Sequence, residues 1–497
     1  MKIQQFLDHH GIGVNPFSEE DAQTDPVFKD HCIYSTYHPS WDKVYGDPAE
    51  PATSIVFGEK GSGKTALRLQ IVRHLTEYNR KNPNQRLFVI EYDDFNPFLD
   101  RFVERVSARA IRKDQVLSQW KLWDHMDAIL SLGVTRLVDR ILDGPKQQNP
   151  SPADIGPLET GLLDRHQARD LLLLAACYDR SMAEAPRRRW HRLRRKLRFR
   201  TWRARWPAAL GFVVVIAVLT AIGAAQDWSW LGTPWPYIVM AAAWIPWVVR
   251  ATRWMWRARR VARQLRVIKR EVNPLRQVLM NFTTDQLAGQ PLPERDRTDD
   301  RFELLVKFQG VLAGLGFTGV VVLVDRVDEP HFVNGAADRM RGLLWPLLDN
   351  KFLKHPGLGF KLLLPIELSY FIEREDRDFY QRARLDKQNM IPSLDWTGEA
   401  LYDVANARLK ACAIDGRTPS LRNLFDDTVD DRRLIAALRT LRVPRHLFKF
   451  LYRVFVAHSN AHTDENPVWQ ISGPTFESVL ALYERDQEAF DRGMAAG

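Results

Sequence analysis

Short runs of β-branched and aromatic residues recur along the chain. Such runs are typical of strands, and a run that is apolar without alternation is typical of a strand buried on both faces of a parallel sheet. We expect strands at 53–57, 87–92, 319–325, 360–366 and 390–394. Together they predict the α/β class, with a parallel sheet that carries helices on both faces.

Helical periodicity marks two other parts of the chain. After residue 65, apolar residues at Leu67, Ile71 and Val72 predict a helix that follows the first strand directly. The C-terminal third is predicted to be helical. We expect helices there at 397–412, 431–441 and 446–456.

Two apolar segments without any charge lie in the middle of the chain. Residues 207–226 are 20 in number, residues 228–249 are 22, and only Asp227 separates them. Each segment matches the ~20 residues that a helix needs to cross the hydrocarbon core of a membrane. The sequence therefore predicts a two-helix transmembrane hairpin at 206–249. Two alternatives stay open: a buried hairpin in a soluble domain, and a second segment that lies in the interface because of its three prolines.

Arginine and lysine are concentrated on both flanks of these segments. Residues 187–205 hold 11 of them and residues 250–270 hold 9, and neither stretch contains an acid. The positive-inside rule predicts that both flanks are cytoplasmic. Without these 20 residues, 51 of the 71 basic residues remain against 61 acidic ones, so the net charge of +10 does not indicate nucleic-acid binding by the whole protein. Their position beside apolar segments favours anionic lipid headgroups over RNA or DNA.

The cysteines and the N-terminal residues indicate a cytoplasmic, reducing setting for the soluble parts. Cys32, Cys177 and Cys412 have neither the spacing of a CxxC pair nor that of a zinc site. They are expected to be buried or free thiols. Residues 1–15 are polar and mixed in charge, so no signal peptide is expected.

A glycine-rich loop between the first strand and the first long helix carries the clearest chemistry. It has the P-loop form GxxxxGK[ST], which binds nucleotide phosphates in this strand–loop–helix context. Its glycines permit positive φ, and Lys64 is a point charge for the β- and γ-phosphates of ATP. The hydroxyl of Thr65 is expected to ligate Mg²⁺. The expected nucleotide-binding residues of the loop are Gly58, Glu59, Lys60, Gly61, Ser62, Gly63, Lys64, Thr65 and Ala66.

A second acidic motif follows the apolar run at 319–325. Asp325 ends that run, where ligands bind in open α/β sheets, and is expected to hold Mg²⁺. The acids resume at Asp328 and Glu329 after an intervening Arg326. Either could be the base that activates water, and Glu329 is preferred. The expected catalytic residues are therefore Lys64, Asp328 and Glu329, although a solvated loop is the alternative for the two acids.

Other polar residues near the predicted strand ends are weaker candidates. Glu367 and Ser369 follow the fourth strand, where a residue that senses the γ-phosphate would lie. Arg382 and Arg384 are candidate arginine fingers, with surface arginines as the alternative. Arg445, at the start of a predicted helix, could reach the phosphates or could be exposed.

These motifs resemble those of the membrane-inserted P-loop ATPases called KAP NTPases, and more broadly the STAND and Orc/Cdc6-like branches of AAA+ ATPases. The resemblance rests on three features: the apolar hairpin between the two nucleotide motifs, the form VLVDRVDE that ends at Glu329, and the Pro444-Arg445 pair. It covers roughly residues 14–460. Arg326 departs from the acid or glycine that is frequent there. The resemblance implies nucleotide-driven switching at the inner face of a membrane, and some relatives take part in bacterial defence.

These features together predict a membrane-anchored ATPase that acts as a switch or assembly platform, with ATP and Mg²⁺ as cofactors. The alternatives are an Orc/Cdc6-like ATPase that handles nucleic acid, and a nucleotide-gated scaffold without hydrolysis. A homo-oligomer or a protein partner is expected, in a bacterial inner membrane with both soluble ends cytoplasmic. The expected domains are an N-terminal segment (1–50), a first nucleotide-binding part (51–100), a helical insertion (101–205), the hairpin (206–249), a basic return segment (250–310), a second nucleotide-binding part (311–396) and a C-terminal helical lid (397–497).

Overall fold

The computed structural model describes residues 1–107, 116–143, 158, 160–181, 184–225, 228–348, 351–385, 388–414 and 416–491. The chain forms two compact units, and neither is continuous in sequence. Unit 1 consists of Met1–Glu77, Leu323–Asp328 and Gly359–Gly497. Unit 2 consists of Tyr78–Val322 and Glu329–Leu358. This division differs from the seven consecutive domains expected from the sequence.

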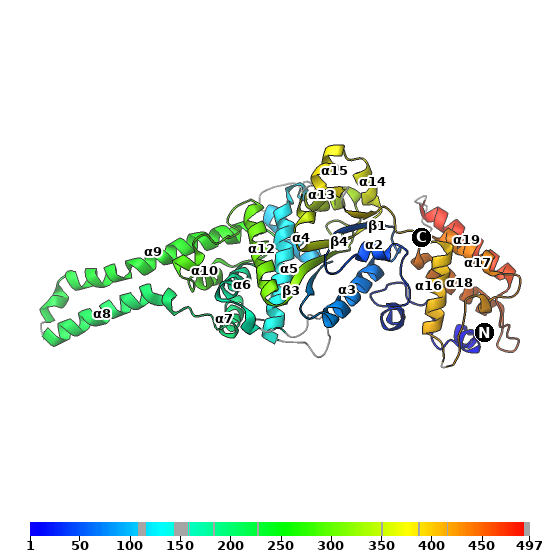
Figure 1. Cartoon of the computed structure of the whole chain (residues 1–497), viewed down its shortest axis with the longest axis horizontal. Coiled ribbons are helices and arrows are strands. Elements are labelled where there is room, and N and C mark those ends of the chain that lie inside the picture. Colours follow the sequence, from blue (N-terminus) through cyan, green and yellow to red (C-terminus); the bar gives the residue numbers. More distant parts are fainter. Residues whose placement is uncertain are drawn as a thin grey trace. The chain divides into compact units, whose positions relative to one another are not determined.

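Five strands form one sheet in the order β2-β3-β4-β1-β5, which confirms the predicted α/β class. Figure 1 labels β1, β3 and β4 of this sheet. Strand β1 pairs in parallel with β4 and with β5, so that Ser54 lies opposite both Lys361 and Asn389. Every residue of β1 and β4 is buried, as expected for strands covered on both faces. Each predicted strand is present within a few residues. The strands are β1 Ser54–Gly58, β2 Arg86–Tyr92, β3 Phe317–Val324, β4 Leu358–Pro365 and β5 Asn389–Ile391.

The helical part of unit 1 combines the two ends of the described chain. Phe6 of α1 (Ile3–His9) packs against Phe455, with ring centroids 5.8 Å apart, in a core formed by the C-terminal helices. Local signals set the helix starts, because the side chains of Thr397 and Asp430 accept hydrogen bonds from first-turn N–H groups. The predicted C-terminal helices are confirmed. They are α16 Gly398–Ala411, α17 Asp431–Leu441 and α18 Pro444–Ala461, followed by α19 Gly473–Asp491.

Unit 2 is built mainly from helices packed beside β2 and β3. Gly133 of α5 (Leu122–Asp143) lies so close to Ile90 and Phe308 that an added Cβ would approach both within about 3 Å. Arg301 and Asp127 form a fully buried ion pair at 3.2 Å, and the hydroxyl of Tyr178 donates to the same carboxylate. The larger helices of this unit are α4 Asn96–Ser107, α5 Leu122–Asp143, α6 Arg165–Tyr178, α7 Pro186–Lys196, α10 Val272–Leu279, α12 Asp299–Gly314 and α13 Ala337–Leu348.

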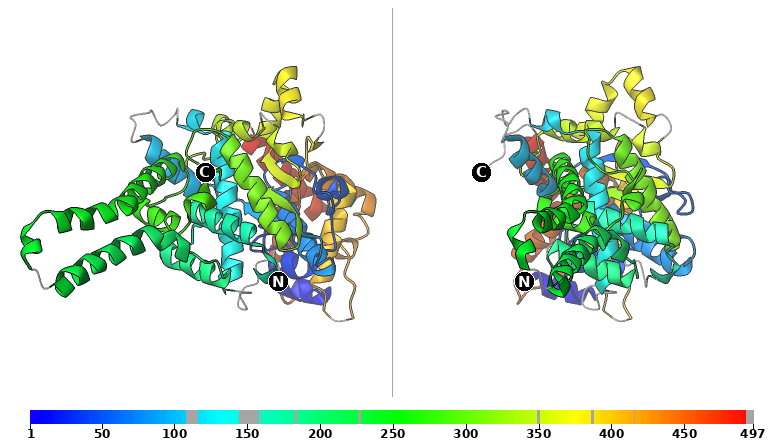
Figure 2. Two further views of the ribbon diagram at one scale, coloured as in Figure 1. Left: turned by 60° about the vertical axis from the view of Figure 1, so that its left-hand side comes forward. Right: turned by 90° about the vertical axis from the view of Figure 1, so that its left-hand side faces the viewer.

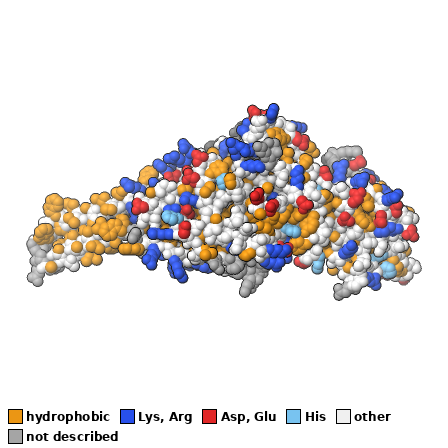
Figure 3. Space-filling view, viewed as in Figure 1, with side chains coloured by type: hydrophobic (Ala, Val, Ile, Leu, Met, Phe, Trp, Pro, Cys, Tyr) orange, Lys and Arg blue, Asp and Glu red, His pale blue; other side chains and the backbone are white. Residues whose placement is uncertain are grey.

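Helices α8 (Trp206–Ala225) and α9 (Trp235–Gln264) lie side by side in unit 2 (Figures 1 and 2). The ring of Trp244 contacts Phe212 and faces Gly211, so the two helices pack directly. Most of their other apolar side chains are exposed, and hydrophobic side chains dominate the surface there (Figure 3).

Only one helix in the described part of the chain is long and apolar enough to cross a membrane. It is Trp206–Ala224 of α8, with a mean hydropathy of 2.3. The second segment predicted to span, residues 228–249, is divided between a short 3-10 helix at Trp228–Gly232 and the first half of α9. Pro246 lies inside α9, and arginines recur through the second half of this helix. The expected pair of transmembrane spans is therefore reduced to one candidate span.

Candidate functional site

The glycine loop joins the end of β1 to the start of α3 (Lys64–Lys81) within unit 1. Gly61 and Gly63 have φ values of +91° and +96°, a region that residues with a side chain rarely adopt. A Cβ at Gly61 would lie 2.6 Å from the Cβ of Arg445. Both backbone conformation and space therefore require glycine at position 61.

Lys64 is folded back over this loop. Its Nζ donates hydrogen bonds to the carbonyl oxygens of Gly58, at 2.8 Å, and Glu59, at 2.9 Å. Burial lowers the pKa of the Lys64 ammonium, while the carboxylates of Asp328 and Asp325 raise it. Because α3 begins at Lys64, the N–H groups of its first turn have no partner within the helix. A cation and a set of backbone donors therefore lie at the same point.

Asp325 meets the start of α3 although 260 residues separate them in sequence. The Thr65 hydroxyl donates to its carboxylate over 3.3 Å, and the N–H of Arg326 donates to its other oxygen at 3.0 Å. Arg326 itself has a φ of +59°, which turns the chain sharply after the strand. Thr65 and Asp325 thus bring together two oxygen ligands of the kind that Mg²⁺ prefers.

Arg68 is a member of the site that sequence analysis missed. It is 2% exposed, and its Nε lies 3.3 Å from the carboxylate of Asp325. Burial raises the pKa of Asp325, and the Arg68 guanidinium is the main influence that lowers it. Arg68 lies one helical turn after Lys64, so both side chains emerge on the same face of α3. The one sign of Arg68 in the sequence was a charged residue one helical turn after Lys64.

Trp396 is a second residue that the sequence did not single out. Its indole N–H donates to the carbonyl of Ser62 over 2.8 Å, and its ring packs edge-on against His38 at 5.0 Å between centroids. The ring is also the nearest group to Gly63, at 3.8 Å from where a Cβ would lie. Trp396 therefore braces the glycine loop from the side of β5.

Arg445 lies beside the loop, as its position at the start of α18 suggested. Its backbone N–H approaches the carbonyl of Gly61 at 3.4 Å. Its guanidinium is 3.9 Å from the carboxylate of Glu20, and Lys449 contacts the same carboxylate at 3.3 Å. The N-terminal segment therefore supplies an acid that pairs with Arg445.

The remaining candidate residues have different surroundings. Asp328 and Glu367 both raise the pKa of Lys64, so their carboxylates lie in its electrostatic surroundings. Glu329 is exposed and belongs to unit 2, which leaves its expected role as base a prediction. Ser369 is buried and donates to the carbonyl of Ile366. Glu59 contributes its carbonyl oxygen to Lys64, and no contact described above involves the other expected residues, Lys60, Ala66, Arg382 and Arg384.

Scans against protein-family models, curated proteins and solved structures found no match to this chain.

The site therefore combines three elements that suit a polyphosphate with a divalent cation. Gly61 and Gly63 give the loop its positive φ angles, Lys64 supplies positive charge, and the Thr65–Asp325 pair supplies hard oxygen ligands. Such an arrangement can bind and orient phosphates and can offset their negative charge.

Proposed function

We propose that this chain is a membrane-anchored P-loop nucleoside triphosphatase that acts as a nucleotide-dependent switch or assembly platform. One observation carries the proposal: the hydroxyl of Thr65 and the carboxylate of Asp325 lie 3.3 Å apart beside the glycine loop, across 260 residues of sequence. The resemblance to KAP NTPases, with a membrane segment between the two motifs, agrees with this proposal. The C-terminal helices α16–α18 would then be the lid.

The residues have separable roles in this proposal. Lys64 would exchange its hydrogen bonds to Gly58 and Glu59 for phosphate oxygens, whose negative charge favours the ammonium form that burial disfavours. Thr65 and Asp325 would hold Mg²⁺, which neutralises phosphate charge when bound. Arg68 pairs with the carboxylate of Asp325, which favours its ionised form and orients it. Asp328 or Glu329 would orient the attacking water and accept its proton.

The membrane part of the proposal rests on α8. Its apolar residues are exposed, with Val213 at 62% and Ile216 at 60%, and such surface is unfavourable in water. Arginine-rich segments lie before α8 and in the second half of α9, so the positive-inside rule puts both at the cytoplasmic side of a bacterial inner membrane. The first half of α9 would complete a hairpin as a second span or as an interfacial helix.

Nucleotide binding and hydrolysis by the full chain in lipid nanodiscs test the proposal. We expect Mg²⁺-dependent ATP turnover that Lys64→Ala abolishes, because the loop then loses the positive charge expected to contact the β- and γ-phosphates. Lys410→Ala, a change of the same kind on an exposed part of α16, is the matched control and should leave turnover intact. Absence of nucleotide binding by the unmodified chain would reject the proposal.

Further variants separate the catalytic alternatives. Glu329→Gln and Asp328→Asn remove one carboxylate each, and the true base is the one whose loss abolishes turnover while ATP still binds. If neither change matters and the chain binds ATP without turnover, the nucleotide-gated scaffold replaces the ATPase. Turnover that rises strongly with added duplex DNA would favour the Orc/Cdc6-like alternative.

A further inference from the structure

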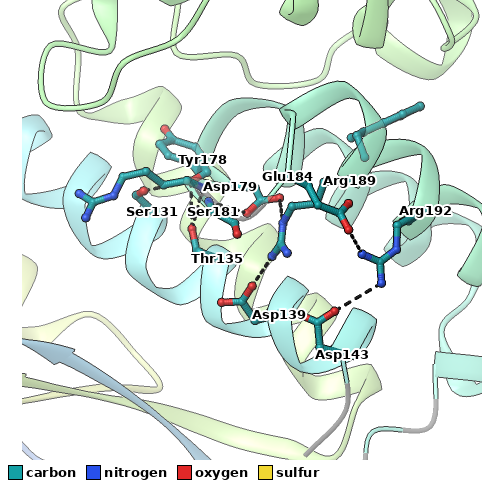
Figure 4. A network of polar contacts seen from close by, with 12 residues as sticks. Ser131, Thr135, Asp139, Asp143, Tyr178, Asp179, Ser181, Glu184, Arg189 and Arg192 are labelled. Carbon is teal, nitrogen blue, oxygen red and sulfur yellow. Dashed lines mark hydrogen bonds and ion pairs between the residues drawn. The ribbon is translucent and has the colours of Figure 1, made fainter. Parts of the chain in front are cut away.

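Helix α7 carries arginines that are neutralised inside unit 2. The guanidinium of Arg189 is 2% exposed and bridges two carboxylates, Asp179 at 2.7 Å and Asp139 at 2.5 Å (Figure 4). Arg192 pairs with Glu184 and, at 3.3 Å, with Asp143. These arginines connect α7 to α5 and to the segment before α7. Carboxylates of the same unit therefore neutralise the positive charge of both arginines.

The arginines at the end of α7 differ from these. Arg195, Arg198 and Arg200 are exposed, and in the described part of the chain no carboxylate forms an ion pair with any of them. A guanidinium presents several donors in a fixed plane, an arrangement that matches phosphate oxygens. Three such groups within six residues form a concentrated anion-binding surface.

These arginines surround two hollows in unit 2. One has a volume of about 590 Å³ and the other of about 380 Å³, and Arg198, Arg200 and Trp202 line both. The one acid among the described lining residues, Asp164, caps α6 by accepting the N–H of Gln167 at 2.7 Å. The hollows are therefore concave, basic and suited to an anionic group.

Arg198 occupies a backbone position where glycine is usual. Its φ is +51°, its N–H donates to the carbonyl of Arg195, and the N–H of Phe199 donates to the carbonyl of Arg194, both at 3.1 Å. This pattern ends many helices, and glycine best tolerates its left-handed residue. Arginine here is less favourable for the backbone than glycine would be. A role for its side chain would account for that choice.

The basic segment leads directly into α8. The indoles of Trp202 and Trp206 are 73% and 63% exposed, and rings of this kind favour the interface between headgroups and hydrocarbon. Arg250 of α9 donates to the carbonyl of Ala204 at 2.6 Å and to that of Met280 at 3.1 Å. These bonds fix the segment between α7 and α8 against the helices of unit 2. The basic hollows therefore lie at the start of the candidate span.

We propose that residues 195–202 form a binding site for the phosphate of an anionic phospholipid headgroup. The inference rests on the proposed membrane anchoring, because the exposed indoles and α8 would place the hollows at headgroup level. Charge alone would also suit nucleic acid or free phosphate. The apolar helix that begins four residues after Trp202 favours the lipid, since its exposed side chains offer nothing to a nucleic-acid backbone.

Native mass spectrometry of the full chain released from nanodiscs tests the site. The nanodiscs contain equal amounts of phosphatidylglycerol and phosphatidylcholine, and the ratio of the two lipids that stay bound is measured. We expect phosphatidylglycerol to be enriched, and Arg195→Gln/Arg198→Gln/Arg200→Gln to lower the enrichment at least about tenfold. The matched control is Arg374→Gln/Arg432→Gln/Arg485→Gln, which removes the same charge from exposed arginines of unit 1 and should change nothing.

A single substitution separates binding from folding. Arg198→Gly suits the left-handed backbone better, so we expect the melting temperature to stay or rise while phosphatidylglycerol enrichment falls. A purely structural arginine would leave the lipid ratio unchanged in this variant.

The outcomes distinguish this inference from the proposed function. If the chain enters nanodiscs but the triple variant keeps its full enrichment, the headgroup site is rejected and the anchoring stands. If the unmodified chain does not enter nanodiscs at all, the proposed membrane location fails first. Displacement of the lipid by inorganic phosphate, or arginine-dependent binding of duplex DNA in its place, would assign the site to those ligands and overturn the lipid proposal.

Discussion

Glu20 holds two basic residues of α18 at the candidate nucleotide site. It lies 3.9 Å from Arg445 and 3.3 Å from Lys449, and all three side chains are 31–43% exposed. Ion pairs with this exposure contribute ~0.2–1 kcal/mol. The pair is therefore weak enough for a bound phosphate to replace Glu20 as the partner of Arg445.

Replacing Glu20 by Gln should strengthen nucleotide binding. Arg445 then no longer exchanges one anion for another, so we expect the dissociation constant for ATP to fall about two- to fivefold. Fluorescence titration with a labelled ATP analogue measures it. Glu19→Gln is the control, since Glu19 is a neighbouring exposed acid. If Glu20→Gln acts equally in an Arg445→Ala background, Arg445 does not contact the nucleotide.

His125 makes unit 2 sensitive to acid. It is fully buried, with ring nitrogens 2.7 Å from the carbonyl of Leu343 and 3.2 Å from the hydroxyl of Tyr92. Burial lowers its pKa to about 4 from the ordinary value of 6.5. Between pH 6.5 and pH 4 the imidazole of His125 is protonated in the unfolded chain but neutral in the folded chain. The free energy of unfolding therefore falls as the pH drops from 6.5 to 4, by up to about 3 kcal/mol.

Denaturant unfolding between pH 7 and pH 4.5 checks this expectation. His125→Gln should flatten this part of the pH dependence, whereas the exposed His166→Gln should reproduce the unmodified profile. Equal slopes for His125→Gln and the unmodified chain would show that His125 does not cause the acid sensitivity.

The sequence indicated those site residues whose chemistry shows in local spacing. Lys64 and Thr65 follow from the glycine pattern, and Asp325 follows from its place at the end of an apolar strand. Arg68 and Trp396 do not, because a helical arginine and a loop tryptophan have many ordinary surface or core roles. Their roles depend on the approach of Asp325 and Ser62, which only tertiary packing brings about.

At the level of elements, the strands were predictable and their order was not. Each strand is a short apolar run, but β4 lies between β3 and β1, and β5 lies outside β1. Parallel strands pair through long connections, so their order depends on packing between distant segments. The uncharged run at 228–249 predicted a second span, but the turn at Trp228–Gly232 divides it and a proline lies within α9. Its three prolines had already indicated the interfacial alternative.

An arginine in the middle of α8 tests its environment. Val213 is 62% exposed, so Val213→Arg should be harmless in water but should cost roughly 2.5–3.5 kcal/mol inside a bilayer. We expect the variant to shift from the washed membrane fraction to the soluble or degraded fraction. Val306→Arg, at a 55% exposed valine of α12, should stay with the membrane. Equal fractionation of both variants would argue against a spanning α8.

For the whole molecule, the candidate nucleotide site and the candidate span belong to different units. Unit 1 holds Lys64 and Asp325, and unit 2 holds α8 and the basic hollows. A switch requires that ligands of the two units affect each other, and thermodynamic linkage makes such an effect reciprocal.

We therefore expect ATP affinity to depend on the lipid. A coupling of ~1–3 kcal/mol would change the dissociation constant of ATP about 5- to 150-fold between phosphatidylglycerol and phosphatidylcholine nanodiscs. Phosphatidylglycerol enrichment should shift by the same factor when ATP is added. Calorimetric titration in both lipids measures the first quantity, with the Arg195/Arg198/Arg200→Gln variant as control. Equal ATP affinities in the two lipids would show that the two sites bind their ligands independently.

The discontinuity of unit 1 has a consequence for biosynthesis. Phe6 and Leu7 belong to the same core as Phe455 and Phe476, so this core cannot form until the C-terminal helices have left the ribosome. Translation at about 5–20 residues per second puts roughly 20–90 s between the two groups. Helix α8 ends 100 residues before Asp325, so it leaves the ribosome before Asp325 can meet Thr65. Under the proposed function, a nascent chain would therefore reach a membrane before its candidate nucleotide site is complete, and the order of its segments would prevent activity during synthesis.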